Sequence, residues 1–332
     1  MSDTPSARRS LSVVYNPLRV DDLDGTKAIV ARICAESGWA DATWIETTAE
    51  ETGEKQAREA VEAGADVVAS LGGDGTVRAV ASALVGTDVA LGLLPGGTGN
   101  LLARNLGLPV GELDDAVRTV VQGHDRRIDV GVVRLCDELP EPESSHATKE
   151  SPPAVADDEE IFLVMTGLGL DGEIMADTDE KLKEKVGWLA YIAAAAKKLS
   201  GRGFPVEVRS GGGEGVVGAP RRSVSRTARA VIVGNCGTLQ GGVELMPEAV
   251  VDDGQLDVVV LAPHGGLGWL SLVTDVVTRH RAGHRRLDRL VAPDLTVEAQ
   301  HPVEAEIDGD AVGRHRALGI RVLPESLVVR VG

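Results

Sequence analysis

Cysteine is scarce in this chain of 332 residues. Its three cysteines, Cys34, Cys136 and Cys236, lie far apart in the sequence and form no CxxC pair. This spacing argues against a disulfide framework and against a structural zinc site, because both need clustered sulfur ligands. We therefore expect a protein of the reducing cytoplasm.

Long hydrophobic runs are also missing. The longest run, at 186–196, is too short to cross a bilayer and is closed by Lys197 and Lys198. Residues 1–10 contain two arginines, but no apolar core of a signal peptide follows them. We therefore expect any membrane contact to be peripheral, at the inner face of the membrane.

Positive charge is in deficit, with 34 Lys and Arg residues against 51 Asp and Glu residues and a net charge of -17. A phosphate backbone would be repelled by this charge, so the composition argues against broad nucleic-acid binding. With 43% hydrophobic and 26% charged residues, the chain is long enough to bury a core and to form two domains.

Two common nucleotide-binding motifs are absent as well. The sequence contains neither the GxxxxGK[ST] string of P-loop kinases nor a GxGxxG turn with a ribose-binding acid. These absences argue against these two classes of nucleotide-binding protein.

Two glycine-rich turns are present instead, at Ser70–Thr76 and Pro95–Asn100. Each follows a β-prone run and precedes a run with helical spacing of apolar residues, and Asn100 is predicted to cap the second helix. Glycines let phosphate oxygens approach the backbone, and amides at a helix start attract anions. Asp74 would repel a bare phosphate, so the first turn favours a nucleotide bound with a divalent cation.

The first half of the chain alternates strands, at 11–15 and 43–48, with helices, at 26–37 and 54–63. This rhythm predicts a doubly wound parallel sheet. Ligands of such sheets bind beyond the carboxyl ends of the strands, which is where Asn16, Thr47 and both glycine turns are expected. A lone turn of this kind often only links a strand to a helix, but two of them favour a site.

The second half predicts a largely antiparallel β domain. Residues 137–160 are acidic and lack periodicity, so we expect a disordered excursion, and 211–226 is expected to be a mobile loop. The predicted strands are 127–133, 161–164, 206–208, 228–233, 256–261, 295–299, 319–323 and 327–331.

Helical spacing returns at 181–199 and 268–281 within this β region. The second helix runs into a basic cluster that ends at Arg289. Two interpretations stay open: a helix that rests on an anionic membrane surface, or a core-packed helix with a solvated basic end.

The two glycine turns resemble those of the diacylglycerol kinase catalytic-domain family, above all the bacterial soluble lipid kinases, which are related to sphingosine kinases. The GGDGT string alone is shared with NAD kinases and resembles the phosphofructokinase loop, whereas the second turn narrows the choice. The other stretches that carry the resemblance are Asn16-Pro17, Ile128–Gly131, Gly167–Asp171, Met246–Ala249, Asp253–Asp257 and Asp308–Asp310.

The resemblance implies an α/β nucleotide-binding domain at 1–127, with a doubly wound parallel sheet as in NAD kinase and phosphofructokinase. It also implies a mainly antiparallel β-sandwich at 128–332 that binds the lipid substrate and completes the active site across a cleft. A return of the last strand to the first domain stays open.

The implied function is that of a magnesium-dependent lipid kinase of phospholipid metabolism, which transfers the γ-phosphoryl group of ATP to the hydroxyl of a diacylglycerol-type acceptor. By resemblance, Asp310 is the general base and Asp74 organises the catalytic magnesium network, in which Asp171 takes part. A second, structural magnesium site is implied at Asp253 with the carbonyls of Val250 and Gln255. The implied ATP contacts are Asn16, Thr47, Gly72, Gly73, Asp74, Gly75, Thr76, Val77, Arg78, Gly97, Thr98 and Asn100.

Two residues depart from the family pattern. Asp310 stands where Glu is usual, and Leu101 stands where many bacterial members have Asp. These departures leave open a catalytically weak nucleotide-binding regulator. The first turn, which is shared with NAD kinases, leaves open a NAD kinase-like or other small-molecule phosphotransferase. The lipid acceptor and a homodimeric state are also left open.

Overall fold

The structure is a computed structural model that describes residues 8–97, 99–137, 155–169, 203–210, 222–239, 243–262 and 287–332. The chain forms two compact units. Unit 1 consists of Met1–Asp129 and Glu325–Gly332, and unit 2 consists of Val130–Pro324. The end of the chain thus returns to the unit in which the chain begins.

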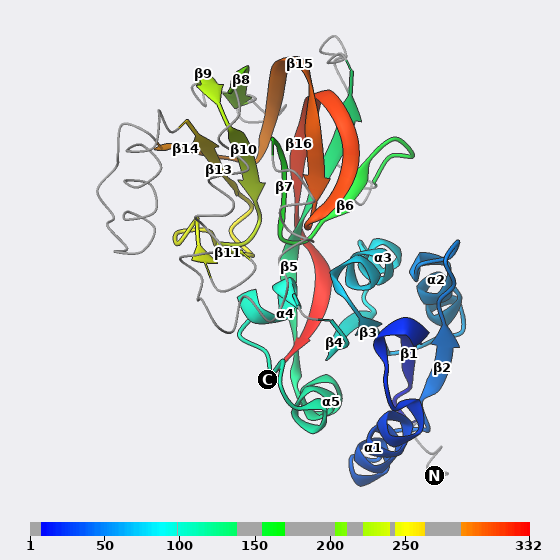
Figure 1. The fold of residues 1–332 in the computed structure, drawn as a ribbon. Coiled ribbons are helices and arrows are strands. Elements are labelled where there is room, and N and C mark those ends of the chain that lie inside the picture. Colours follow the sequence, from blue (N-terminus) through cyan, green and yellow to red (C-terminus); the bar gives the residue numbers. More distant parts are fainter. Residues whose placement is uncertain are drawn as a thin grey trace, which may run out of the picture. The chain divides into compact units, whose positions relative to one another are not determined.

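Strands and helices alternate in unit 1 (Figure 1). Strands β1 to β4 are all parallel and lie in the order β4-β3-β1-β2, which confirms the predicted doubly wound sheet. The elements are β1 (Leu11–Tyr15), the 3-10 helix η1 (Pro17–Arg19), α1 (Leu23–Glu36), β2 (Thr43–Glu46), α2 (Glu54–Glu62), β3 (Val67–Gly72), α3 (Asp74–Leu84), β4 (Ala90–Pro95), α4 (Leu101–Asn105), α5 (Leu113–Gln122) and the start of β5 (His124–Cys136).

In the strands of unit 1, successive side chains point to opposite faces of the sheet, and those on each face can pack against helices. Alternate residues such as Val13 and Ala69 pack against α1 and α5, while α2 and α3 pack together and contact the strands as well. Gly92 lets α5 approach β4 closely, because a Cβ at this position would lie 2.9 Å from a methyl group of Val120. The helices therefore cover the strands, and the loops at the carboxyl ends of the strands form one edge of the sheet.

Unit 2 is built from antiparallel strands, which confirms the predicted β-sandwich class. Its main path runs β14-β13-β10-β7-β15-β16, and β8 joins β9 to β15. The elements are the rest of β5, β6 (Glu160–Phe162), β7 (Met165–Leu168), β8 (Phe204–Ser210), β9 (Ser223–Ala228), β10 (Ala230–Gly234), β11 (Thr238–Leu239), β12 (Val243–Glu244), β13 (Leu256–Leu261), β14 (Leu287–Ala292), β15 (Asp294–Ile307) and β16 (Asp310–Val331).

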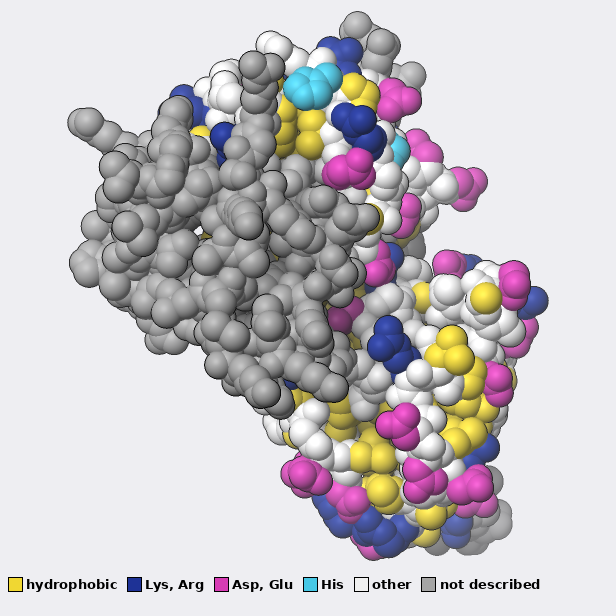
Figure 2. All heavy atoms as spheres, viewed as in Figure 1, with side chains coloured by type: hydrophobic (Ala, Val, Ile, Leu, Met, Phe, Trp, Pro, Cys, Tyr) yellow, Lys and Arg dark blue, Asp and Glu magenta, His cyan; other side chains and the backbone are white. Residues whose placement is uncertain are grey.

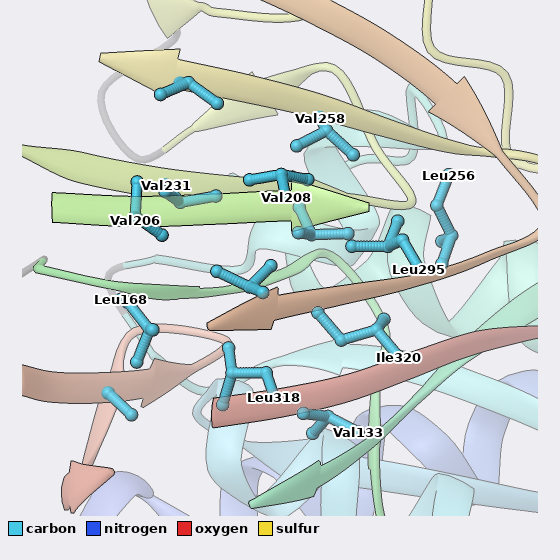
Figure 3. Packing of buried hydrophobic residues seen from close by; sticks show 14 of the residues in the cluster. Val133, Leu168, Val206, Val208, Val231, Leu256, Val258, Leu295, Leu318 and Ile320 are labelled. Carbon is cyan, nitrogen blue, oxygen red and sulfur yellow. The ribbon is translucent and has the colours of Figure 1, made fainter. Parts of the chain in front are cut away.

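Branched aliphatic side chains fill the core of unit 2, as Figure 3 shows. Val206 and Val208 of β8 are buried, whereas Glu207 between them is partly exposed. This alternation is the pattern of a sheet with one dry face. Leu318 and Ile320 of β16 contribute to the same core on the other side of the cluster.

Several predicted boundaries in unit 2 are wrong. The segments predicted at 295–299 and 319–323 are parts of two long strands, β15 and β16, which form one hairpin. Arg226, expected in a mobile loop, lies in β9, and Glu160, expected in the disordered acidic stretch, begins β6. Polar residues concealed these strands, because their outer faces are solvated.

Glu159 belongs to the part of the acidic stretch that the structure describes. Its carboxylate accepts hydrogen bonds of 2.6 and 3.2 Å from Arg321, and the Ala156 amide donates to it at 3.0 Å. Burial alone would raise the pKa of Glu159, but these hydrogen bonds outweigh it and hold the pKa below its ordinary value. The ion pair fixes the start of β6 to β16.

The predicted helices at 181–199 and 268–281, most of the acidic stretch and residues 211–221 lie outside the described residues. In the part of the chain that the structure describes, no helix is long and apolar enough to cross a membrane. Acidic side chains are spread over the described part of the face shown in Figure 2, with Lys and Arg side chains between them.

Arg330 ties the returning strand to helix α5. Its guanidinium is almost completely buried and donates to the carbonyl of Val120 at 2.8 Å, to those of Val121 and Gly123, and to the carboxylate of Asp125 at 2.7 Å. The last carbonyls of a helix have no partner within the helix and carry its negative dipole end. Arg330 therefore caps α5 and holds the end of the chain in unit 1.

We expect Arg330→Ala to reduce the free energy of unfolding by about 3 kcal/mol, because it leaves buried carbonyls without a donor. Arg330→Lys should recover little of this free energy, since the ammonium group of lysine cannot reproduce the planar set of donors of the guanidinium group. Denaturant titration measures both effects. Arg32→Ala, which removes a surface arginine paired with Glu36, is the control and should cost less than about 1 kcal/mol. Equal losses for Arg330→Ala and Arg32→Ala would contradict the capping role.

Candidate functional site

The carboxyl edge of the unit 1 sheet brings four predicted segments side by side. Strand β1 pairs in parallel with β2 and β3, and β3 pairs in parallel with β4. All four strands therefore end at the same edge. Along it the segments follow in the order Gly96 turn, Gly72 turn, Asn16 and Thr47. The sequence predicts that the four meet at this edge but does not predict their order.

Asn16 and Thr47 are held to this edge by their backbones. The Asn16 amide donates to the carbonyl of Leu71 at 3.0 Å, and its side-chain oxygen accepts from the Leu18 amide at 3.0 Å. The Thr47 amide donates to the carbonyl of Tyr15 at 2.9 Å, and its side chain is buried. Both residues thus continue the sheet into the loops at the candidate site.

The two glycine turns pack against each other backbone to backbone. A Cβ on Gly96 would lie 2.8 Å from the Gly72 nitrogen and 3.0 Å from its Cα, and a Cβ on Gly97 would lie 2.9 Å from the Cα of Gly73. Real Cβ atoms do not approach backbone so closely. Contact between the turns therefore requires these glycines, even in the absence of a ligand.

Asp74 links the first turn to the second. It is the first residue of α3, and its Oδ1 accepts a hydrogen bond of 2.6 Å from the Leu101 amide, the first residue of α4. A carboxylate at this place satisfies one of the unpaired amides of the helix start. The cap of α4 thus comes from a residue 27 positions earlier in the sequence.

The predicted capping role of Asn100 is wrong. Its backbone is left-handed, with φ of 46°, and its side-chain amide donates to the Gly97 carbonyl at 2.8 Å instead of accepting from the helix. Arg104 adds a second bond to the same turn, from Nε to the Gly99 carbonyl at 2.8 Å. Asn100 and Arg104 therefore fix the shape of the second turn from its carboxyl side.

The remaining residues of the first turn divide by burial. Thr76 and Val77 are buried on the inner side of α3, whereas Gly73, Asp74, Gly75 and Arg78 are partly exposed. Thr76 lies below the turn, since a Cβ on Gly72 would meet its Oγ1 at 2.7 Å. The structure thus brings Gly72–Thr76 together with Gly97 and Asn100, while Thr98 lies outside the described residues.

Gln56 is a polar residue of this edge that the sequence does not reveal. Its side-chain amide is buried and donates to the carbonyls of Glu46 at 3.2 Å and Glu51 at 3.1 Å. It therefore fastens the loop that carries Thr47 to helix α2. Only its position on the inner face of an otherwise charged helix could have indicated this role.

Asp310 belongs to unit 2 and is exposed. It pairs with Ile307 across a two-residue turn formed by Asp308 and Gly309, whose φ values are 50° and 91°. An Asp-Gly pair with two positive φ angles is a type I′ hairpin turn. The strand period does not reveal Asp308, and the Asp-Gly pair is the signal from which the turn could have been predicted.

The turn at 250–255 contains the other implied magnesium ligands. Asp253 is exposed, and its Oδ1 accepts from the Gln255 amide at 2.9 Å. Burial, followed by the charges of Asp253 and Glu248, raises the pKa of nearby Asp257 to about 6. Among the described residues no three His, Cys, Asp or Glu side chains are grouped to hold a metal, and Asp171 lies outside those residues.

We expect Gly96→Ala to destabilise the protein by about 1–3 kcal/mol, because its Cβ would overlap the backbone of Gly72. Gly73→Ala is the matched control for stability, since a Cβ there meets no atom within 4 Å. Thermal and denaturant unfolding of the two variants give the comparison. A loss of stability in Gly73→Ala as large as in Gly96→Ala would contradict the close packing of the turns.

Two family models match the chain. The model described as the diacylglycerol kinase catalytic domain matches residues 11–133, and the model described as the YegS C-terminal NAD kinase beta sandwich-like domain matches residues 164–331. The first match contains both glycine turns. The second contains the hairpin of Asp308 and Asp310.

Known proteins show the same likeness. A protein named "Probable lipid kinase YegS-like" from Xanthomonas euvesicatoria pv. vesicatoria is 30% identical over 275 residues, which cover 81% of this chain and 78% of the relative. "Uncharacterized protein sll0036" from Synechocystis sp. is 25% identical over 96% of this chain, which spans 62% of that protein's length.

A crystal structure of a diacylglycerol kinase from Bacillus anthracis str. Sterne has a TM-score of 0.72 at 21% identity, over 99% of both chains. At this identity the likeness shows the fold alone. The family models and the Xanthomonas relative carry the assignment further. The chain belongs to the diacylglycerol kinase catalytic-domain family, as a YegS-like member of this family of kinases.

Proposed function

We propose that the protein is a lipid kinase that transfers the γ-phosphoryl group of ATP to the hydroxyl of a diacylglycerol-type lipid. Family membership supports a kinase. The observation that carries the proposal is the joint construction of the two glycine turns, which are packed backbone to backbone and joined by the bond from the Leu101 amide to Asp74. Two turns fixed in this way form one partly exposed surface rather than two separate linkers.

The first turn offers the features that phosphate groups need. It lies at the start of α3, an 11-residue helix whose first amides and dipole favour an anion. Gly73 leaves open space where a side chain would stand. In the proposal, ATP lies along this edge with its phosphates on Gly72–Thr76 and Gly97, and Asn16, Thr47, Val77, Arg78, Thr98 and Asn100 complete its contacts.

The donor set suits magnesium by its chemistry. Mg²⁺ prefers oxygen ligands, and Asp74 offers a partly exposed carboxylate in the first turn. Asp74 is proposed to hold the ion together with Asp171, and Asp253 with the carbonyls of Val250 and Gln255 is proposed to hold a structural ion. Bound magnesium neutralises phosphate charge and thereby supports phosphoryl transfer.

The proposed transfer is an in-line displacement. The lipid hydroxyl oxygen forms a bond to the γ-phosphorus while the bond from this phosphorus to the β,γ-bridging oxygen breaks, and ADP leaves. Asp310 accepts the hydroxyl proton. Its exposure, at the first position after a tight turn, suits a group that meets an acceptor from outside. Its side chain is one methylene shorter than the usual Glu.

Transfer from labelled ATP tests the proposal. The purified protein is incubated with Mg²⁺ and either vesicles of a total lipid extract or soluble acceptors such as NAD, and the labelled product is identified by mass. A labelled lipid supports the proposal. A labelled soluble acceptor indicates a small-molecule phosphotransferase, and ATP binding without any transfer indicates a nucleotide-binding regulator. Either result would contradict lipid phosphorylation.

We expect Asp74→Asn to lower kcat by about 100-fold or more while the protein stays folded. The asparagine oxygen can still accept the hydrogen bond from the Leu101 amide, but the negative charge of the Asp74 carboxylate is lost. Asp74→Ala should lose stability as well, because the cap of α4 disappears. Steady-state kinetics and thermal unfolding separate the two effects. Unchanged turnover in Asp74→Asn would overturn the role of this carboxylate.

Asp310 is tested by a pair of variants. We expect Asp310→Ala to lower kcat by about 100-fold or more, since general-base catalysis typically contributes this much. Asp310→Glu, which restores the family's usual residue, should retain measurable activity. Stability should hardly change in either variant, because the side chain is exposed. A fully active Asp310→Ala variant would show that another group accepts the proton.

A further inference from the structure

The turn that precedes Asp310 places a buried carboxylate at the tip of a hairpin. Asp308 adopts a left-handed conformation with φ of 50°, which costs free energy for any residue with a Cβ. Glycine at the next position, with φ of 91°, carries no such cost. Asp308 is also buried, although a hairpin tip is usually exposed. Its place in the fold therefore calls for a specific set of partners.

Three backbone amides surround the Asp308 carboxylate. Its Oδ2 accepts from the Leu163 amide at 3.0 Å, and its Oδ1 accepts from the amides of Val164 at 2.8 Å and Met165 at 3.1 Å. The Asp308 amide in turn donates to the Met165 carbonyl at 2.8 Å. Hydrogen bonds to an ionised carboxylate are about twice as strong as neutral ones. These bonds hold the tip of the hairpin to the start of β7.

The segment that holds Asp308 is itself fixed. The amides of Asn235 and Cys236 both donate to the Val164 carbonyl, at 2.9 and 3.2 Å, and the side-chain amide of Asn235 donates to the Leu163 carbonyl at 3.1 Å. Burial, with the nearby charge of Asp308, raises the pKa of the Cys236 thiol, which stays protonated and donates to the Leu163 carbonyl. The anchor thus rests on the interior of unit 2.

A second carboxylate holds the turn from the strand side. Glu306 is completely buried, and its Oε2 accepts from the Gly309 amide at 2.8 Å. The Glu306 carbonyl accepts from the Thr166 hydroxyl at 2.8 Å. Both residues of the turn are therefore tied to groups outside it, and Asp310 follows directly with its side chain exposed.

We propose that Asp308 is a positioning residue that sets the place of the Asp310 carboxylate by anchoring the hairpin turn to the amides of Leu163, Val164 and Met165. This inference rests on the proposed function insofar as it concerns the proton acceptor. A shift of about 1 Å in a reacting group can cost about 100-fold in rate, so a loosened turn should slow phosphoryl transfer. Asp308 itself contacts backbone and does not act on substrate.

The decisive variant is Asp308→Asn. Asparagine also favours a left-handed turn position, so the backbone preference is kept. Its amide nitrogen must replace one carboxylate oxygen and would face either the Leu163 amide or the pair of Val164 and Met165 amides, donor against donor. The variant therefore tests the anchor rather than the turn. Val208→Ala, in the core at β8, is a control for simple loss of stability.

Two readouts are measured on the full chain. Amide exchange of Leu163, Val164, Met165 and Asp310 reports on the anchor without any need for activity. Initial rates with Mg·ATP and diacylglycerol in mixed micelles give kcat and the KM for ATP. We expect Asp308→Asn to accelerate exchange at these amides and to lower kcat by about tenfold or more, with the KM for ATP changed by less than about twofold. Val208→Ala should lower the thermal midpoint without this fall in kcat.

A double variant completes the test. In an Asp310→Ala background, Asp308→Asn should cause no further fall in kcat, because the group it positions is gone. The proposal is overturned by an unchanged Asp310 amide, by wild-type kcat in Asp308→Asn, or by an equal fall in both backgrounds. If the wild-type protein transfers no phosphate, the proposed function fails instead, and exchange at the Asp310 amide alone decides whether Asp308 fixes its position.

Discussion

Close contact between two glycine turns is the constraint on which the candidate site depends. Gly96 and Gly97 approach Gly72 and Gly73 within distances that no Cβ would allow, and Asp74 spans the contact to cap α4. The parallel register of β3 with β4 places the turns side by side, since Gly72 pairs with Pro95. The proposed phosphate site thus depends on strand register, on glycines and on one carboxylate.

The two units use carboxylates in the same physical way. In unit 1 Asp74 accepts from the Leu101 amide, and in unit 2 Asp308 accepts from three amides near the start of β7. Each replaces a missing backbone partner and fixes a loop that carries a proposed functional group. Acidic residues in these turns therefore serve the architecture as well as the proposed chemistry, and charge-neutral variants separate the two roles.

Much of the fold can be predicted from the sequence because its signals are local. Apolar runs that end at Asn16 or at the glycine turns identify the parallel strands, and Asp308-Gly309 identifies a hairpin. The α4 cap could not be predicted: Asn100 is the better local candidate, and the bond from Leu101 to Asp74 exists only after β3 and β4 pair. The polar residues on the outer faces of β15 and β16 concealed the length of these strands. The role of Arg330 could not be predicted either, because its guanidinium binds the carbonyl of Val120, which lies 210 positions earlier in the sequence.

The central claim is that both glycine turns bind the phosphates of one nucleotide. Titration of the isotopically labelled protein with Mg²⁺ and a non-hydrolysable ATP analogue, followed by amide chemical shifts, tests it most directly. The account predicts that the amides of Gly72–Gly75 and of Gly96–Asn100 shift together and saturate with one dissociation constant. Shifts confined to one turn, or found only elsewhere in the chain, would contradict it.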